Sequence, residues 1–147
     1  MSEESKKRIS FGKIELAIMA VFFALLAFFY PRNFLFFHSM SEIFSIVVAF
    51  MIFVVGWNSK KFHSNGYFLF IGMAFLFVGV VDFLHTVSYK GMNVFAGTSS
   101  DLATQLWIVA RYVYAVSMLA APLFLTKRFR LEIALPLYAG ITGIVLF

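Results

Sequence analysis

The sequence predicts an all-α fold, a polytopic transmembrane bundle of about five helices. Hydrophobic residues make up 62% of the 147 residues and charged residues only 13%, with a mean hydropathy of +0.91. Soluble proteins have about 45–50% apolar and about 25% charged residues. The apolar residues also gather in runs long enough to cross a hydrocarbon core of about 30 Å. These observations exclude a soluble globule, and the lack of cysteine excludes disulfides and thiolate sites.

Each predicted span ends at a polar or helix-breaking segment. Pro31 and Asn33 separate the first two spans, because proline lacks a backbone donor and disfavours helix in the residue before it. The second span ends at a polar turn, the third at the pair Lys90 and Gly91, and the fourth at a basic turn. Pro122 and Pro136 predict kinks. The five spans are Ile14–Tyr30, Phe34–Trp57, Tyr67–Tyr89, Leu102–Thr126 and Leu131–Phe147.

The distribution of basic residues predicts the orientation. When the connecting segments are assigned alternately to the two sides, nine basic residues fall on one side and two, Arg32 and Lys90, on the other. Cytoplasmic segments are enriched in Lys and Arg, so we expect a multi-pass protein of the cytoplasmic membrane with residues 1–13 as a cytoplasmic basic tail. Residues 14–147 form the membrane domain. The nine are Lys6, Lys7, Arg8, Lys13, Lys60, Lys61, Lys127, Arg128 and Arg130.

Ionisable side chains from three spans fall at one predicted depth. At 1.5 Å per residue, His38 and Glu42 lie about 6 and 12 Å below the outer end of the second span. His85 and Asp82 lie about 6 and 10 Å down the third span, and Arg111 about 13 Å down the fourth. Charged residues inside a membrane are costly and usually face the interior of the bundle. We therefore predict that these five side chains converge.

Helical spacing supports this convergence. Successive residues rotate by about 100°, which places His38 and Glu42 in one stripe and Asp82 and His85 in another. On the fourth span Trp107 shares a face with Arg111, whereas Gln105 lies about 120° away from it. We expect the three stripes to turn inward. The predicted ligand-binding or sensing residues are His38, Glu42, Asp82, His85, Trp107 and Arg111.

Two interpretations of this cluster stay open. In the structural one, Arg111 neutralises Glu42 and Asp82, and the network only sets helix register. In the functional one, the cluster holds a ligand. These side chains are compatible with three kinds of ligand. One is a transition metal bound by His38, Glu42, Asp82 and His85. The others are a b-type haem with His38 and His85 as axial ligands, and a quinone. The sequence shows no nucleophile and base pair and no HExxH motif, so hydrolysis has little support, and we expect this chain itself not to be an enzyme.

Three segments of the chain are similar to one known family. They contain the strings FHS-x-x-E, DxLHTxxYKGM and ATQLWIxAR, and together they extend over roughly 33–124. This combination resembles the membrane-associated sensor domain MASE3. The resemblance covers most of the predicted cluster. In this sequence the strings contain His38, Ser39, Glu42, Asp82, His85, Thr86, Tyr89, Lys90, Gly91, Gln105, Trp107 and Arg111.

The resemblance implies a sensory input domain of a signal-transduction protein. Such domains precede PAS, histidine kinase (two-component) and GGDEF diguanylate cyclase units, so any kinase or cyclase activity would belong to a part beyond Phe147. We expect the chain to be an N-terminal fragment, with the lipid bilayer, a small ligand and a downstream cytoplasmic module as partners, and a homodimer in the full-length protein. No nucleic-acid partner is expected. The alternative is a small membrane protein that binds a haem or metal for redox chemistry, and a transporter is less favoured.

Overall fold

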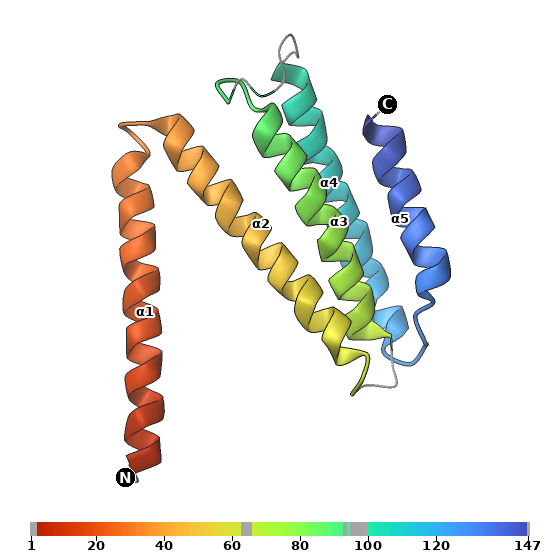
Figure 1. The fold of residues 1–147 in the computed structure, drawn as a ribbon, viewed down its shortest axis with the longest axis horizontal. Helices are drawn as coiled ribbons and strands as arrows, with labels where there is room; N and C mark the ends of the chain where they lie inside the picture. The colour runs from red at the N-terminus through yellow and green to blue at the C-terminus, as the bar shows by residue number, and fades with distance from the viewer. Residues whose placement is uncertain (1–2, 63–65, 93, 95–99, 147) are drawn as a thin grey trace. The chain divides into compact units, whose positions relative to one another are not determined.

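A computed structural model describes residues 3–62, 66–92, 94 and 100–146. Within these residues every regular element is helical, which confirms the predicted fold class (Figure 1). Four of the helices are long and apolar enough to span a membrane, and the last is a shorter apolar helix. The elements are α1 (Glu3–Phe29), α2 (Phe34–Ser59), α3 (Tyr67–Ser88), α4 (Ser100–Ala120), the 3-10 helix η1 (Ala121–Phe124) and α5 (Leu131–Leu146).

The helix ends differ from the predicted spans mainly at the first and fourth. Helix α1 begins at Glu3, so much of the predicted tail is helical, although the apolar stretch begins only at Gly12. The fourth predicted span is two elements, because Pro122 falls in the first turn of η1 and ends α4. Pro136, by contrast, lies inside α5, which continues through it.

The chain forms two compact units, Met1–Ser41 and Glu42–Phe147. In the first unit, Asn33 caps α2 by accepting a hydrogen bond from the backbone N–H of Phe36 at 3.0 Å. Aromatic rings pack around this turn, with the centroids of Phe29 and Phe36 4.7 Å apart and those of Tyr30 and Phe37 5.1 Å apart. The predicted break between the first two spans is thus a capped, aromatic turn.

In the second unit, α3 is the central helix. Its buried residues lie around most of its circumference, because it packs against α4, η1 and α5 and approaches α2 closely at Gly72 and Gly79. A Cβ placed on Gly56 of α2 would lie 2.5 Å from the Phe68 carbonyl oxygen and 2.8 Å from Gly72 Cα. One placed on Gly79 would lie 3.2 Å from Ala49 Cβ. The two antiparallel helices therefore touch backbone to backbone at Gly56 and Gly72.

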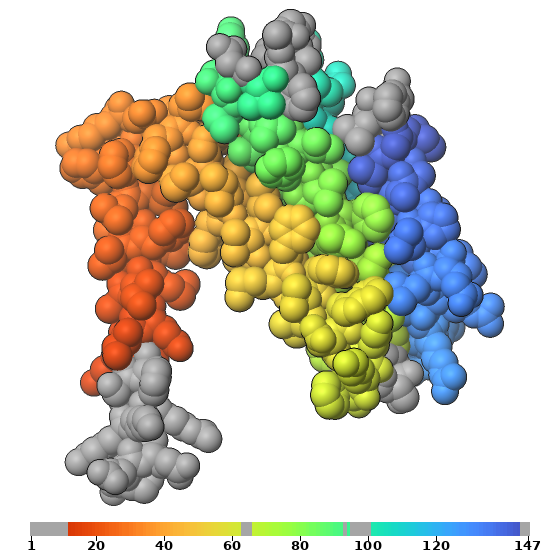
Figure 2. Space-filling view, viewed as in Figure 1, coloured from red at the N-terminus to blue at the C-terminus, as the bar shows by residue number. Residues whose placement is uncertain are grey.

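Small residues also bring α3 and α4 together. Helix α4 buries Ala103, Leu106, Ala110 and Ser117, which recur at helical spacing on one face. Against them lies Val81 of α3, which forms an apolar cluster with Leu106 and Ala110. In lipid the association of helices depends on close packing, and small side chains permit it. In the space-filling view the green residues of α3 adjoin the blue residues of α5, with which α3 is in contact (Figure 2).

The turn before α5 is attached to the start of α3. The Gly66 N–H donates to the Lys127 carbonyl at 2.9 Å. The Phe129 ring packs edge-on against Phe70 and Phe124, with both pairs of centroids 5.3 Å apart. These contacts place the 127–130 turn at the same end of the second unit as the turn that follows α2.

This arrangement makes the membrane orientation testable with single cysteine variants, since the chain has no cysteine of its own. Lys60 and Lys127 are exposed at the end of the second unit that holds the turns after α2 and before α5. Lys90, which follows α3, is exposed at the opposite end. If the basic end is cytoplasmic, a membrane-impermeant maleimide should label Lys90→Cys in intact cells. Lys60→Cys and Lys127→Cys should react only after permeabilisation. Labelling of either in intact cells would contradict the orientation.

Candidate functional site

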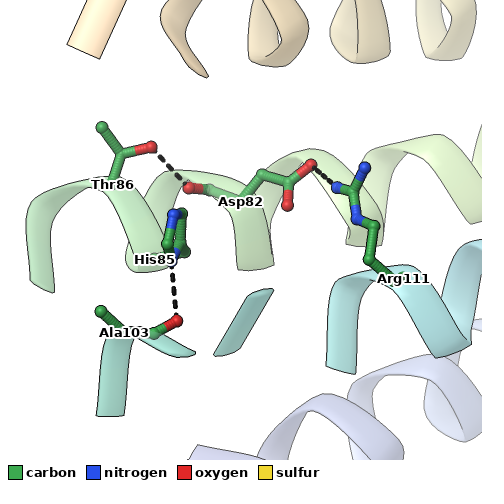
Figure 3. A network of polar contacts seen from close by, with 5 residues as sticks. All are labelled: Asp82, His85, Thr86, Ala103 and Arg111. Carbon is green, nitrogen blue, oxygen red and sulfur yellow. Dashed lines mark hydrogen bonds and ion pairs between the residues drawn. The ribbon is translucent and has the colours of Figure 1, made fainter. Parts of the chain in front are cut away.

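Asp82 of α3 and Arg111 of α4 form an ion pair inside the second unit (Figure 3). The Asp82 side chain is 4% exposed, whereas that of Arg111 is 44% exposed and reaches Asp82 from the edge of the helix interface. Arg111 bonds only one carboxylate oxygen. The other, Oδ1, is buried and has no hydrogen-bond partner among the described residues. A buried acceptor of this kind is costly, so it could accept a hydrogen bond from a ligand or water.

His85 lies one turn after Asp82 and is anchored to α4. Its Nδ1 lies 2.7 Å from the Ala103 carbonyl oxygen, and the residue is buried (Figure 3). A carbonyl can only accept, so Nδ1 carries the proton and, in the neutral ring, the lone pair lies on Nε2. Histidines that bind metals commonly donate their other ring N–H to a carbonyl in this way. The contact therefore both orients the ring and selects its tautomer.

Glu42 is brought to His85 by the register of α2 against α3. Gly56 of α2 lies opposite Gly72 of α3, and Ala49 lies opposite Gly79. Because the helices are antiparallel, a position seven residues earlier in α2 lies opposite a position seven residues later in α3. One further step places Glu42 opposite Thr86, beside His85. A carboxylate oxygen of Glu42 and a ring nitrogen of His85 lie within 4.8 Å of each other. Glu42 also lies within electrostatic range of Asp82 and Arg111.

The four residues carry an unequal charge. Two carboxylates, Glu42 and Asp82, face a single guanidinium, which is bound to Asp82. By residue type, the cluster holds two acidic side chains, one guanidinium and one imidazole. Such a group can bind a cation, a proton or a hydrogen-bond donor, and a carboxylate beside an imidazole suits a transition metal.

The face of α4 that is buried in the structure differs from the one that the sequence predicted. Trp107, which shares the predicted face with Arg111, is 44% exposed within the described chain. The face turned toward α3 is the neighbouring one, because Ala103 and Ala110 allow a closer approach than the large side chains would. Arg111 still reaches Asp82 because its side chain is long. Its guanidinium carbon lies 5.8 Å from the centroid of the Trp107 ring one turn before it.

The remaining predicted residues lie in various places. Gln105 is exposed, as its position on the helix indicated. His38 lies in the first unit, half-buried, with its ring stacked on that of Phe34 at a centroid distance of 6.0 Å. Thr86 donates to the Asp82 carbonyl oxygen (Figure 3). Gly91, with a φ of 113°, adopts a left-handed conformation that side chains disfavour and so permits the turn after α3. His63 lies outside the described residues.

Sequence reasoning missed one participant, the carbonyl of Ala103. A backbone acceptor has no residue-type signal, and its partnership with His85 depends on the register of α3 against α4. The small residues at positions 103, 110 and 117 were a signal for close approach of these helices, and it would have placed the Ala103 backbone next to α3.

Comparison with known proteins identifies the family of this chain. The family model MASE3, a membrane-associated sensor domain, matches residues 29–147. Neither the comparison with curated proteins nor that with solved structures found a match. The matched region covers well over half of the chain and includes the whole charged cluster of α2, α3 and α4. Together with several helices apolar enough to span a membrane, the match shows that the chain belongs to the MASE3 family of membrane-associated sensor domains.

Proposed function

We propose that this sensor domain detects a small ligand at the cluster of Glu42, Asp82, His85 and Arg111. It would pass the signal to a cytoplasmic kinase, PAS or cyclase module of a longer, homodimeric protein. The observation that carries the proposal is the pairing of Glu42 with His85 across two helices, beside an ion pair. Helix register in lipid can be set by small residues and hydroxyls, and Gly56 and Gly72 already set it here. The additional charges therefore favour binding.

The chemistry of the donors favours a divalent transition metal as the ligand. Glu42 supplies a carboxylate and His85 an Nε2 whose lone pair is directed by the bond to Ala103. The sequence places His38 one turn before Glu42 on the same helix, and its role as a donor stays a prediction. Asp82, already bound to Arg111, would balance charge rather than coordinate. Arg111 would hold this carboxylate in place.

We propose that binding changes the packing of α2 on α3. The two helices touch backbone to backbone at Gly56 and Gly72, about 21 Å along α2 from Glu42. A ligand that draws Glu42 toward His85 would tilt α2 about this contact and so move the turn after Ser59. By the positive-inside orientation that turn is cytoplasmic, where a downstream module would receive the movement.

Binding can be tested on the purified chain with Co²⁺ as a spectroscopic probe. We expect visible Co²⁺ absorption in the wild type and a weakening of binding by at least about tenfold in Glu42→Gln and in His85→Ala, because each removes a donor. Glu132→Gln, which removes an exposed carboxylate on α5, is the matched control and should bind as the wild type does. Equal Co²⁺ binding by all four proteins would overturn the metal assignment.

The redox alternative has a separate readout. His85, oriented by Ala103, could also serve as an axial ligand of a haem. A haem protein would show a Soret band after purification that is lost in His85→Ala and in His38→Ala.

The sensing role itself can be tested in a full-length parent protein. If its output still responds to the signal in the Glu42→Gln and His85→Ala variants, the cluster has only a structural role. Gln105→Ala, outside the cluster, is the control for that assay.

A further inference from the structure

A second candidate site lies between α4, η1 and α5, apart from the charged cluster. Here the structure contains a cavity of about 570 Å³. Its lining is mostly apolar, with Val113 and Val116 from α4, Phe124 from η1, and Leu137 and Ile141 from α5. Pockets that hold small molecules have volumes of about 300–1,000 Å³. The cavity is thus large enough to hold part of an amphiphile.

The charge of the cavity is concentrated at one end. Arg128 and Arg130, from the turn between η1 and α5, contribute to its lining. This turn is held in place, because the Lys127 carbonyl accepts the Gly66 N–H and Phe129 packs against Phe70 and Phe124. The two guanidinium groups are therefore attached to a turn with a defined position at the boundary of the apolar helices.

Two hydroxyl groups of the cavity lining satisfy each other. The hydroxyls of Ser117 and Tyr138 form a buried hydrogen bond of 2.6 Å. Glu132, the acidic residue closest in sequence to the two arginines, does not line the cavity. The lining therefore offers positive charge at one end and an apolar surface along the rest.

We propose that this cavity binds an anionic phospholipid. Its phosphate would lie between Arg128 and Arg130, and an acyl chain would extend along the apolar sides of α4 and α5. A phospholipid carries an anionic phosphate next to apolar acyl chains. This order matches the cavity, in which the arginines of the turn adjoin the apolar helices. Arginine presents a planar fork of donors that matches phosphate oxygens, and basic pockets between transmembrane helices commonly bind anionic head groups. This charge complementarity favours a lipid over a purely apolar partner helix.

The proposal can be tested with the full chain reconstituted in nanodiscs of equal amounts of phosphatidylglycerol and phosphatidylcholine. Native mass spectrometry after release then measures the phosphatidylglycerol that stays bound. We expect selective retention by the wild type and a loss of at least about tenfold in R128Q/R130Q, since each basic side chain near anionic lipid contributes about fivefold. The matched control K60Q/K127Q removes two charges at the same end outside the cavity lining and should change retention less than about twofold.

A second pair of variants tests the apolar part. Val116→Trp fills the cavity from α4 without altering the arginines, and we expect it to lower retention by about fivefold or more. Leu119→Trp adds the same ring to an exposed position of α4 that does not line the cavity, and it should have no effect. Circular dichroism checks that all variants keep their helical content. Equal losses in R128Q/R130Q and K60Q/K127Q would indicate general attraction to the membrane and overturn the proposal, as would unselective lipid retention by the wild type.

Discussion

Replacing Arg111 by methionine should lower the free energy of unfolding by about 3–5 kcal/mol, because it leaves the buried Asp82 carboxylate without its partner. Removing both charges in D82L/R111M should restore most of this loss, since an apolar pair of similar size in such a position is often neutral. The measurement is unfolding in mixed micelles with increasing SDS, followed by circular dichroism.

A second double variant, in which Glu42 is replaced together with Arg111, tests whether Asp82 or Glu42 is the partner of Arg111. By sequence either carboxylate could neutralise the guanidinium, but in the structure Arg111 binds Asp82. We therefore expect E42Q/R111M to be as unstable as R111M, because Asp82 stays unpaired. Rescue by the Glu42 substitution, or equal stability of R111M and the wild type, would show that the Asp82 pairing is wrong.

Gly56→Ala should destabilise the protein by about 1–3 kcal/mol or more, the usual range for overpacking. The new methyl group would lie 2.5 Å from the Phe68 carbonyl oxygen and 2.8 Å from Gly72 Cα. Both are backbone atoms, so no side-chain rotation can relieve the collision and α2 must move away from α3. The same SDS unfolding measurement gives the change.

Gly140→Ala is the matched control for this substitution. Gly140 also lies within a helix, α5, but a Cβ there would meet nothing within 4 Å. Alanine favours helix over glycine by about 1 kcal/mol, so Gly140→Ala should be neutral or stabilising. If Gly56→Ala behaves in the same way, the backbone contact between α2 and α3 does not exist as described.

The predicted spans agree closely with the helices because membranes restrict the choice of backbone structure. A segment in hydrocarbon must satisfy its own backbone hydrogen bonds, so an apolar run of sufficient length becomes a helix. The starts of α2, α3 and α5, at Phe34, Tyr67 and Leu131, are the predicted ones. The early start of α1 was missed because helix in a polar segment has no hydropathy signal.

Part of the candidate site also followed from sequence. Helical rise and rotation grouped Glu42, Asp82, His85 and Arg111 at one depth, and the structure brings these four together. Depth and angle refer to one helix at a time, so they do not specify pairs. That Arg111 binds Asp82, and that His85 bonds to Ala103, follows from how the three helices are aligned.

The sequence by itself determined where α2, α3 and α5 begin and the level of the charges, because these depend on local composition and on the energetics of inserting each segment. Only the tertiary structure decided which face of α4 is buried. The predicted face held Trp107 and Arg111, but the helix packs on α3 through Ala103, Leu106 and Ala110. Lipid is as apolar as a protein core, so hydrophobicity does not select the buried face. Close packing selects it, and this depends on the shapes of both helices at once.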